Sequence, residues 1–285
     1  MLHGSHATGS ARDALARRAQ ATLDAATQKE GDWIWIHALE VRLELGEKEK
    51  VRGLLLPRLS EFERTTIRIG VWRVLANSAS SKEERGTWIT KIERAFLEPA
   101  ATDRLQAIET LGKLGHPPPG AVLDAARVLR STMPESEALF PLWALILAGE
   151  QGAATQLVGS LSAPEVGVKR RAAFIMRWLK PESAWMRSAL ARAVAEEKAG
   201  TIAYPYLLST SLSLDLDPPR RHEWSQALEK LLPNVAGSVC LEACQALRRV
   251  YTPADVSRLA PLLDHTEADT RIGASWVILH VLSTK

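Results

Sequence analysis

The sequence predicts an all-α chain that is built from repeated pairs of helices. Residues 257–282 show one copy of the repeat. Its first helix carries three leucines, and a polar turn follows. Its second helix carries Ala274, Ile278 and Val281, which are spaced like one buried helical face. Because such a pair cannot bury its apolar side alone, it needs similar pairs beside it.

The second-helix pattern recurs along the chain, and its first inward-facing residue marks each copy. Eight such anchors are present: Ala38, Val71, Ala107, Ala144, Ala172, Ala203, Ala243 and Ala274. The gaps between successive anchors are 33, 36, 37, 28, 31, 40 and 31 residues. A drifting period of this length is typical of an α-solenoid. No stretch alternates polar and apolar residues for long enough to compete as a strand.

The expected helices follow in chain order. An alanine-rich helix over 11–26 would cover the open end of the stack. A single helix is expected over 33–46, and the copies of the repeat that follow occupy the segments 54–76, 96–115, 121–149, 155–179, 183–212, 222–250 and 257–282. Pro141 is expected in the first turn of its helix, where a missing N–H is harmless, and Pro205 interrupts its copy. Residues 1–10 are expected to be an added leader, and residues 11–285 a single repeat domain.

The composition is that of a globular protein. The chain has 285 residues, of which 46% are hydrophobic and 24% charged, so it can bury a sizeable core. A formal net charge of +3 is low for a dedicated nucleic-acid binder. No apolar run approaches the roughly 20 residues that a membrane-spanning helix needs. We therefore expect neither a nucleic acid nor a membrane as partner.

The two cysteines, Cys240 and Cys244, lie four residues apart on a predicted helix. This spacing puts them on one face but gives poor geometry for a disulfide within one helix. No nearby pair of histidines would complete a zinc site, so we expect both thiols to be buried as small apolar groups. Free thiols weakly favour a cytoplasmic location, although a native targeting segment could be missing from the sequence.

Three segments carry a motif that resembles HEAT and HEAT-like repeats: LLDHTEADTRIGASWVIL (262–279), SLSAPEVGVKRRAAFIMRWL (160–179) and DRLQAIETLGKLG (103–115). The motif consists of leucines, a polar turn, a basic residue and then Ala-x3-Leu-x2-Leu. The resemblance covers most of residues 30–282. It implies a right-handed α-solenoid of about seven or eight helix pairs. Chains of this kind are chiefly protein-binding scaffolds, and a few are enzymes.

A candidate binding surface follows from the resemblance, because second helices usually line the concave side of HEAT-like stacks. Positions −1, +2 and +6 from each anchor share one stripe of the helix surface. The residues of this stripe that we expect to bind a ligand are His37, Glu40, Arg73, Asn77, Glu109, Lys113, Trp143, Arg171, Trp178 and Trp276.

The stripe changes in character along the chain. Glu40, Arg73 and Glu109 take the same position in three consecutive copies, so we expect them side by side with alternating charge. The later copies carry aromatic residues there instead. Such a surface could recognise an extended peptide or a small polar ligand. The alternative is a structural ladder of ion pairs on a solvated face.

A basic residue also recurs near the start of several second helices, at Arg68, Arg104, Lys169 and Arg271. We expect these side chains to reach the preceding turn or a neighbouring acid and to serve the fold.

The sequence favours a non-catalytic binding module. A protein or peptide is the first partner that we expect, and a small polar ligand is the second. We expect no catalytic residue, cofactor or metal, because none of the common nucleophile, phosphate-binding, zinc or dinucleotide motifs is present. The rival hypothesis is another nucleic-acid-binding solenoid or an enzyme similar to the HEAT-like DNA glycosylases, whose groove carries tryptophans, basic residues and an aspartate. Here the stripe contains tryptophans and arginines but no aspartate.

Overall fold

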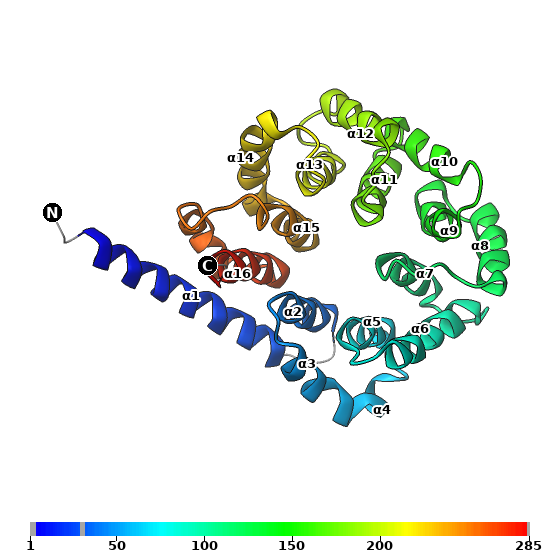
Figure 1. Ribbon diagram of the computed structural model, residues 1–285, viewed down its shortest axis with the longest axis horizontal. Coiled ribbons are helices and arrows are strands. Elements are labelled where there is room, and N and C mark those ends of the chain that lie inside the picture. The colour runs from blue at the N-terminus through cyan, green and yellow to red at the C-terminus, as the bar shows by residue number, and fades with distance from the viewer. Residues whose placement is uncertain (1–3, 29–31, 284–285) are drawn as a thin grey trace. The chain divides into compact units, whose positions relative to one another are not determined.

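The computed structural model describes residues 4–28 and 32–283, and it is all-helical there. These residues form sixteen α-helices, five short 3-10 segments and no strand (Figure 1). The chain divides into two compact units. Unit 1 comprises residues 1–47 and 215–285, and unit 2 comprises residues 48–214. The single-domain expectation stays a prediction.

The eight anchors predicted from the periodicity lie where a helical core requires them. Each is at most 1% exposed. Seven of them lie inside helices, and Ala203 is the N-cap residue of the helix Tyr204–Ser213. That helix starts late because Pro205, which lacks an N–H, occupies its first turn. The local pattern therefore located the buried face of every second helix.

Unit 1 is assembled from both parts of the chain. Its helices are α1 (Gly4–Gln28), α2 (Trp33–Glu44), α14 (Arg221–Leu231), α15 (Gly237–Leu247) and α16 (Ala268–Ser283). Helix α16 packs on α15, α1 and α2. Leu23, Ala38 and Val41 form a shared core with Ile272 and Trp276. An open stack in which each repeat touches only its sequence neighbours lacks such a contact.

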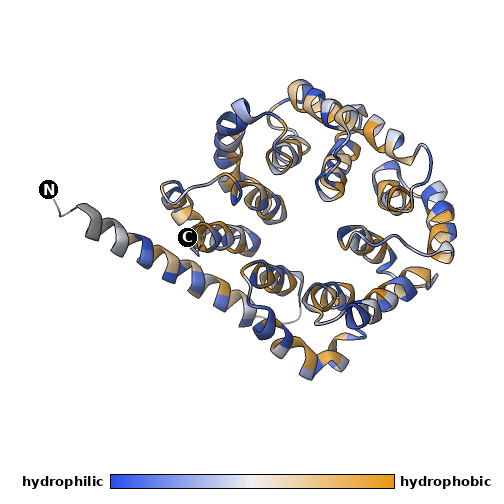
Figure 2. Cartoon of the chain, viewed as in Figure 1, coloured by the Kyte–Doolittle hydropathy of each residue, from blue (hydrophilic) through white to orange (hydrophobic). Residues whose placement is uncertain are grey.

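Unit 2 contains the helices α3 (Lys48–Leu55), α4 (Leu59–Phe62), α5 (Arg68–Ser78), α6 (Lys82–Leu97), α7 (Arg104–Lys113), α8 (Gly120–Thr132), α9 (Glu135–Leu147), α10 (Ala153–Gly159), α11 (Val166–Leu179), α12 (Ala184–Glu196) and α13 (Tyr204–Ser213). The second helices α5, α7, α9, α11 and α13 pack in series. Helices α6, α8, α10 and α12 form the other layer (Figure 1). Helix α9 is buried along 139–145 and carries much orange in Figure 2.

Prolines and helix ends account for the differences from the expected elements. Helix α1 extends beyond the expected 11–26 at both ends. Pro141 lies at the seventh position of α9, because Glu135–Glu137 begin that helix earlier than expected. The first-turn expectation for this proline is therefore wrong. The first helix of the last pair is a 3-10 segment, Val256–Asp264, with Pro261 inside it.

The recurring basic residues hold helix starts in place, as expected. Arg68 donates to both carboxylate oxygens of Asp103, at 2.6 and 3.0 Å. Arg104 donates to the carbonyl oxygen of Phe96. Lys169 pairs with Glu197 and Arg271 donates to two carbonyl oxygens of the preceding turn, those of His265 and Thr266. These contacts confirm that the four cations reach the preceding turn or a neighbouring acid, and their structural role stays a prediction.

Candidate functional site

The ten stripe residues fall into two groups, one in each unit. Unit 1 holds His37, Glu40 and Trp276, and unit 2 holds Arg73, Asn77, Glu109, Lys113, Trp143, Arg171 and Trp178. Asn77 is exposed, whereas Arg73 is only 5% exposed. The part that each residue has in binding stays a prediction, but the two groups differ in chemistry.

The unit 2 residues converge around α9, and we refer to Glu109, Lys113, Trp143, Arg171, Phe174 and Trp178 as the α7–α11 cluster. Helices α7 and α11 each pack on α9. From α7, the ammonium group of Lys113 lies 5.3 Å from the ring centre of Phe174 and 5.9 Å from that of Trp178. Because these rings belong to α11, side chains from the two flanking helices meet over the middle one. Such cation–π contacts are worth about 0.5–2 kcal/mol.

Trp143 forms the buried centre of this cluster. Its side chain is 0% exposed and packs edge-on to Phe174, with ring centres 6.2 Å apart. On its other side it lies against the backbone of α7 at Gly112. A Cβ atom at Gly112 would come within 2.4 Å of the indole ring. The glycine therefore allows the indole to approach α7 closely enough for Lys113 to reach across to α11.

Glu109 is the acidic member of the cluster and pairs with Lys113 one turn along α7, at 2.8 Å. Burial opposes ionisation of its carboxyl group, but the positive charges of Lys113, Arg73 and Arg171 outweigh that cost and lower the pKa of Glu109. Arg73 donates to the hydroxyl of Thr110 at 3.2 Å. Arg73 therefore acts on Glu109, as neighbouring members of the ladder should, while Glu40 belongs to unit 1 and its place in the ladder stays a prediction.

Arg171 packs against an aromatic ring and keeps one buried N–H donor without an acceptor. Its guanidinium lies 4.1 Å from the ring centre of Phe140, and its buried Nε has no hydrogen-bond acceptor. Burial lowers the pKa of Arg171. The positive charge of Arg170 lowers this pKa further, whereas the negative charges of Glu109 and Glu137 raise it. A buried donor without an acceptor costs about 1–3 kcal/mol, so this nitrogen lowers the stability of the cluster.

Three residues at or beside the α7–α11 cluster were not identified from the sequence. Arg177 is 6% exposed, and its guanidinium lies 5.5 Å from the ring centres of both Phe174 and Trp178. It lies at position +5 from its anchor, outside the stripe. Gly112 and Thr110 were also missed. A glycine inside a regular helix is the one signal that could have indicated the close approach of Trp143.

The unit 1 group is bound into contacts between the two chain segments of that unit. His37 lies 2.9 Å from Asp269 of α16. Arg248 pairs with Glu44 of α2 at 3.0 Å, and its guanidinium lies 4.7 Å from the ring centre of Trp276. Trp276 is 6% exposed and belongs to the unit 1 core. These contacts join helices that are distant in sequence.

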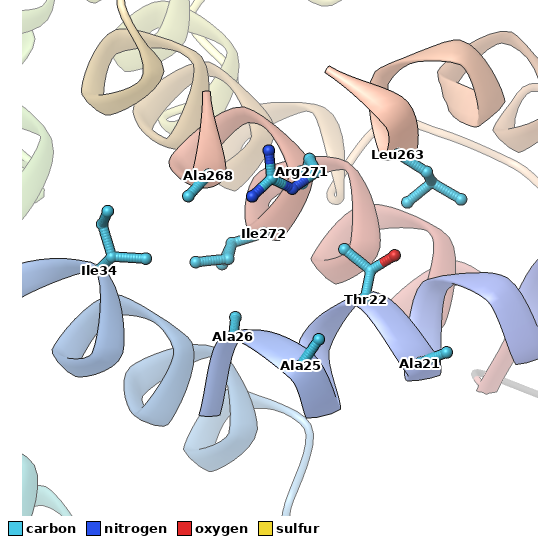
Figure 3. Close-up of a pocket in the computed structure, with 9 residues that line it drawn as sticks. All are labelled: Ala21, Thr22, Ala25, Ala26, Ile34, Leu263, Ala268, Arg271 and Ile272. Carbon is cyan, nitrogen blue, oxygen red and sulfur yellow. The ribbon is translucent and has the colours of Figure 1, made fainter. Parts of the chain in front are cut away.

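Unit 1 also contains an apolar cavity of about 340 Å³ between α1 and α16 (Figure 3). Its lining residues are Ala21, Thr22, Ala25, Ala26, Ile34, Leu263, Ala268, Arg271 and Ile272. Three alanines of α1 leave this space because their side chains are short. The guanidinium of Arg271 is already bonded to the preceding turn, so the cavity offers little polar recognition.

Among residues 4–28 and 32–283, no helix is both long and apolar enough to cross a membrane. Within the same ranges, no group of three or more His, Cys, Asp and Glu side chains could hold a metal ion. Cys240 and Cys244 are free and buried, as expected.

Comparison with known proteins gives no relative for this chain: no family model, no curated protein and no solved structure matches it. The proposed function therefore rests on the geometry of the two units.

Proposed function

We propose that this chain is a non-catalytic binding module built from HEAT-like helix pairs in a right-handed α-solenoid arrangement. Its ligand is a protein segment or a small polar molecule. The surface of the second helices of unit 2 recognises that ligand, with the α7–α11 cluster as its centre.

This proposal rests on one observation, the contact of Lys113 with the rings of Phe174 and Trp178. Aromatic and cationic side chains from two helices meet over a third helix. Trp and Arg side chains with one apolar and one polar part are enriched where proteins bind their ligands. Lys113 and Glu109 keep only 18% and 22% of their side-chain surface exposed, so a ligand would meet groups that are already positioned.

A ligand screen tests the proposal. Purified protein is heated with a panel of metabolites, sugars, short peptides and short DNA, at low and at moderate salt. A ligand at about 100 times its dissociation constant stabilises the folded state by about 2.7 kcal/mol. We expect a peptide or a small polar molecule to raise the melting temperature of the wild type and to lose most of that effect in Trp178→Ala.

Lys91→Ala provides a matched control for Lys113→Ala. Lys91, on α6 in the other layer, lies 5.6 Å from the ring centres of both Trp72 and Trp88. It therefore makes the same kind of cation–π contact away from the α7–α11 cluster. We expect Lys113→Ala to weaken ligand binding and Lys91→Ala to leave it unchanged. Equal losses in both variants, or no response to any ligand, would contradict the proposal.

The DNA arm of the screen addresses the glycosylase alternative. A protein that binds nucleic acid through its phosphates loses affinity steeply as salt rises. We expect no stabilisation by DNA. Stabilisation at low salt that disappears at moderate salt would favour the nucleic-acid alternative instead.

A further inference from the structure

We propose that a cavity of unit 2, between α8, α9 and α10, binds a free α-amino acid with an apolar side chain. The cavity has a volume of about 370 Å³ and shares no residue with the α7–α11 cluster. It is therefore a second site, separate from the surface of the proposed function. The inference follows from a cation and an anion that line this one cavity and from the apolar residues beneath them.

The cavity lies where three helices of unit 2 meet. Helices α8 and α10 both pack on α9 (Figure 1). The lining includes Arg130 near the end of α8, Glu135 at the start of α9 and Gln156 on α10. Sites for small molecules usually have volumes of about 300–1,000 Å³. Since an apolar cavity of about 150 Å³ already holds benzene, the cavity is large enough for an amino acid of medium size.

Arg130 supplies a positive charge for the carboxylate of the ligand. Its Nη2 donates to the side-chain oxygen of Gln156, which positions the guanidinium. Within residues 4–28 and 32–283, Arg130 forms no ion pair. Its other two nitrogens and the amide nitrogen of Gln156 therefore remain as donors beside the cavity. A guanidinium binds both oxygens of a carboxylate, and such charge-assisted bonds are the stronger kind.

Glu135 supplies a negative charge for the ammonium group of the ligand. It lines the same cavity and is exposed. In the described part of the chain it pairs neither with Arg130 nor with another cation. Two opposite charges that line one cavity without pairing with each other suit a ligand that carries both charges. The carboxylate and the ammonium group of a free amino acid lie on one carbon atom, so one small molecule reaches both side chains.

Apolar residues form the floor of the cavity and would contact the side chain of the amino acid. Leu139 and Leu142 of α9 are 4% and 2% exposed, and Ala138 and Ala163 also line the space. An apolar side chain that leaves water for this floor favours binding, whereas a charged one loses hydration. The site should therefore prefer amino acids with apolar side chains.

Isothermal titration with leucine and its truncated analogues tests this inference. Isocaproate is leucine without the ammonium group, isoamylamine is leucine without the carboxylate, and glycine lacks the apolar side chain. We expect leucine to bind. Each of the three analogues should bind at least about tenfold more weakly, because one set of contacts is lost.

Two charge variants assign the two ends of the ligand. Arg130→Gln should weaken binding of leucine about tenfold and leave binding of isoamylamine unchanged, because this amine has no carboxylate. Glu135→Gln should weaken binding of leucine about tenfold and leave binding of isocaproate unchanged. Arg127→Gln is the matched control. Arg127 lies one turn earlier on α8 and pairs with Glu150 and Asp124, so its loss should leave leucine binding unchanged.

The outcomes separate this site from the α7–α11 cluster. Absence of binding by leucine overturns the inference, and so does equal binding of leucine and either charged analogue. Similar losses in Arg127→Gln and Arg130→Gln overturn it as well. Trp178→Ala should bind leucine as the wild type does, because Trp178 does not line this cavity. A loss in Trp178→Ala would move leucine to the α7–α11 cluster, which would overturn this inference and support the proposed function.

Discussion

The two units use similar residue types for different ends. In unit 1, Arg248 lies between Glu44 and Trp276, and His37 faces Asp269, so each charged group meets a partner from a distant helix. In unit 2, the cations of the α7–α11 cluster outnumber its single carboxylate. The first arrangement joins two segments of the chain, and the second brings a cation of α7 against aromatic rings of α11. The role of arginine, glutamate and tryptophan side chains in each unit therefore has to be inferred from the groups that they contact.

The largest effect is expected in unit 1, at Arg42. This arginine is 0% exposed, pairs with Asp24 of α1 and with Glu47, and donates to Thr27 at 2.9 Å. Its removal breaks a buried ion-pair network, so we expect Arg42→Ala to lower the free energy of unfolding by about 3 kcal/mol. Denaturant titration measures this loss.

A surface ion pair of the same unit provides the control for Arg42. Arg221 and Asp215 are about half exposed, and exposed pairs of this kind contribute little. Arg221→Ala should therefore change the free energy of unfolding by less than about 0.5 kcal/mol. If the two variants lost similar amounts, the buried pairs would not be what holds α1 and α2 together.

The next effect is expected at the centre of the α7–α11 cluster. Gly112→Ala would place a methyl group in the ring of Trp143, so the indole must move. We expect the free energy of unfolding to fall by about 2 kcal/mol, the usual cost of overpacking, and ligand binding to weaken. The comparison is Gly86→Ala in α6, where no atom lies within 4 Å of the new Cβ.

At Gly86 alanine should stabilise the helix by about 0.5–1 kcal/mol, because alanine is the better helix former. Denaturant titration of both variants measures these changes in the free energy of unfolding. Stabilisation by Gly112→Ala as well would mean that Trp143 does not lie against α7.

The smallest effect is a pH dependence that originates at Glu109. The pKa of Glu109 is lowered in the folded state, so its contribution to stability is present above the unfolded-state pKa and is lost as the pH falls through the folded-state pKa. Between about pH 6 and about pH 3 the wild type should lose more stability than Glu109→Gln. Thermal unfolding across this range measures the difference, and parallel curves would show that the cations do not hold this carboxylate ionised.

The sequence predicted the helices better than their assembly. The anchors were located because helical periodicity is a local property of the chain. The packing of α16 on α1 and α2 joins residues more than 200 positions apart, as in the contact of His37 with Asp269, and no local pattern contains that information. Arg177 was missed for a similar reason, since its position is set by which helix packs against α11.

A paired measurement on Lys113→Gln and Arg248→Gln tests the difference between the two units most directly. Each variant is assayed for the free energy of unfolding and for stabilisation by the ligand that the screen identifies. We expect Lys113→Gln to weaken binding about tenfold with little change in stability. Arg248→Gln should lower stability by about 1 kcal/mol and leave binding intact. If Arg248→Gln removed binding, or if Lys113→Gln changed only stability, the assignment of binding to unit 2 and of structural pairing to unit 1 would be wrong.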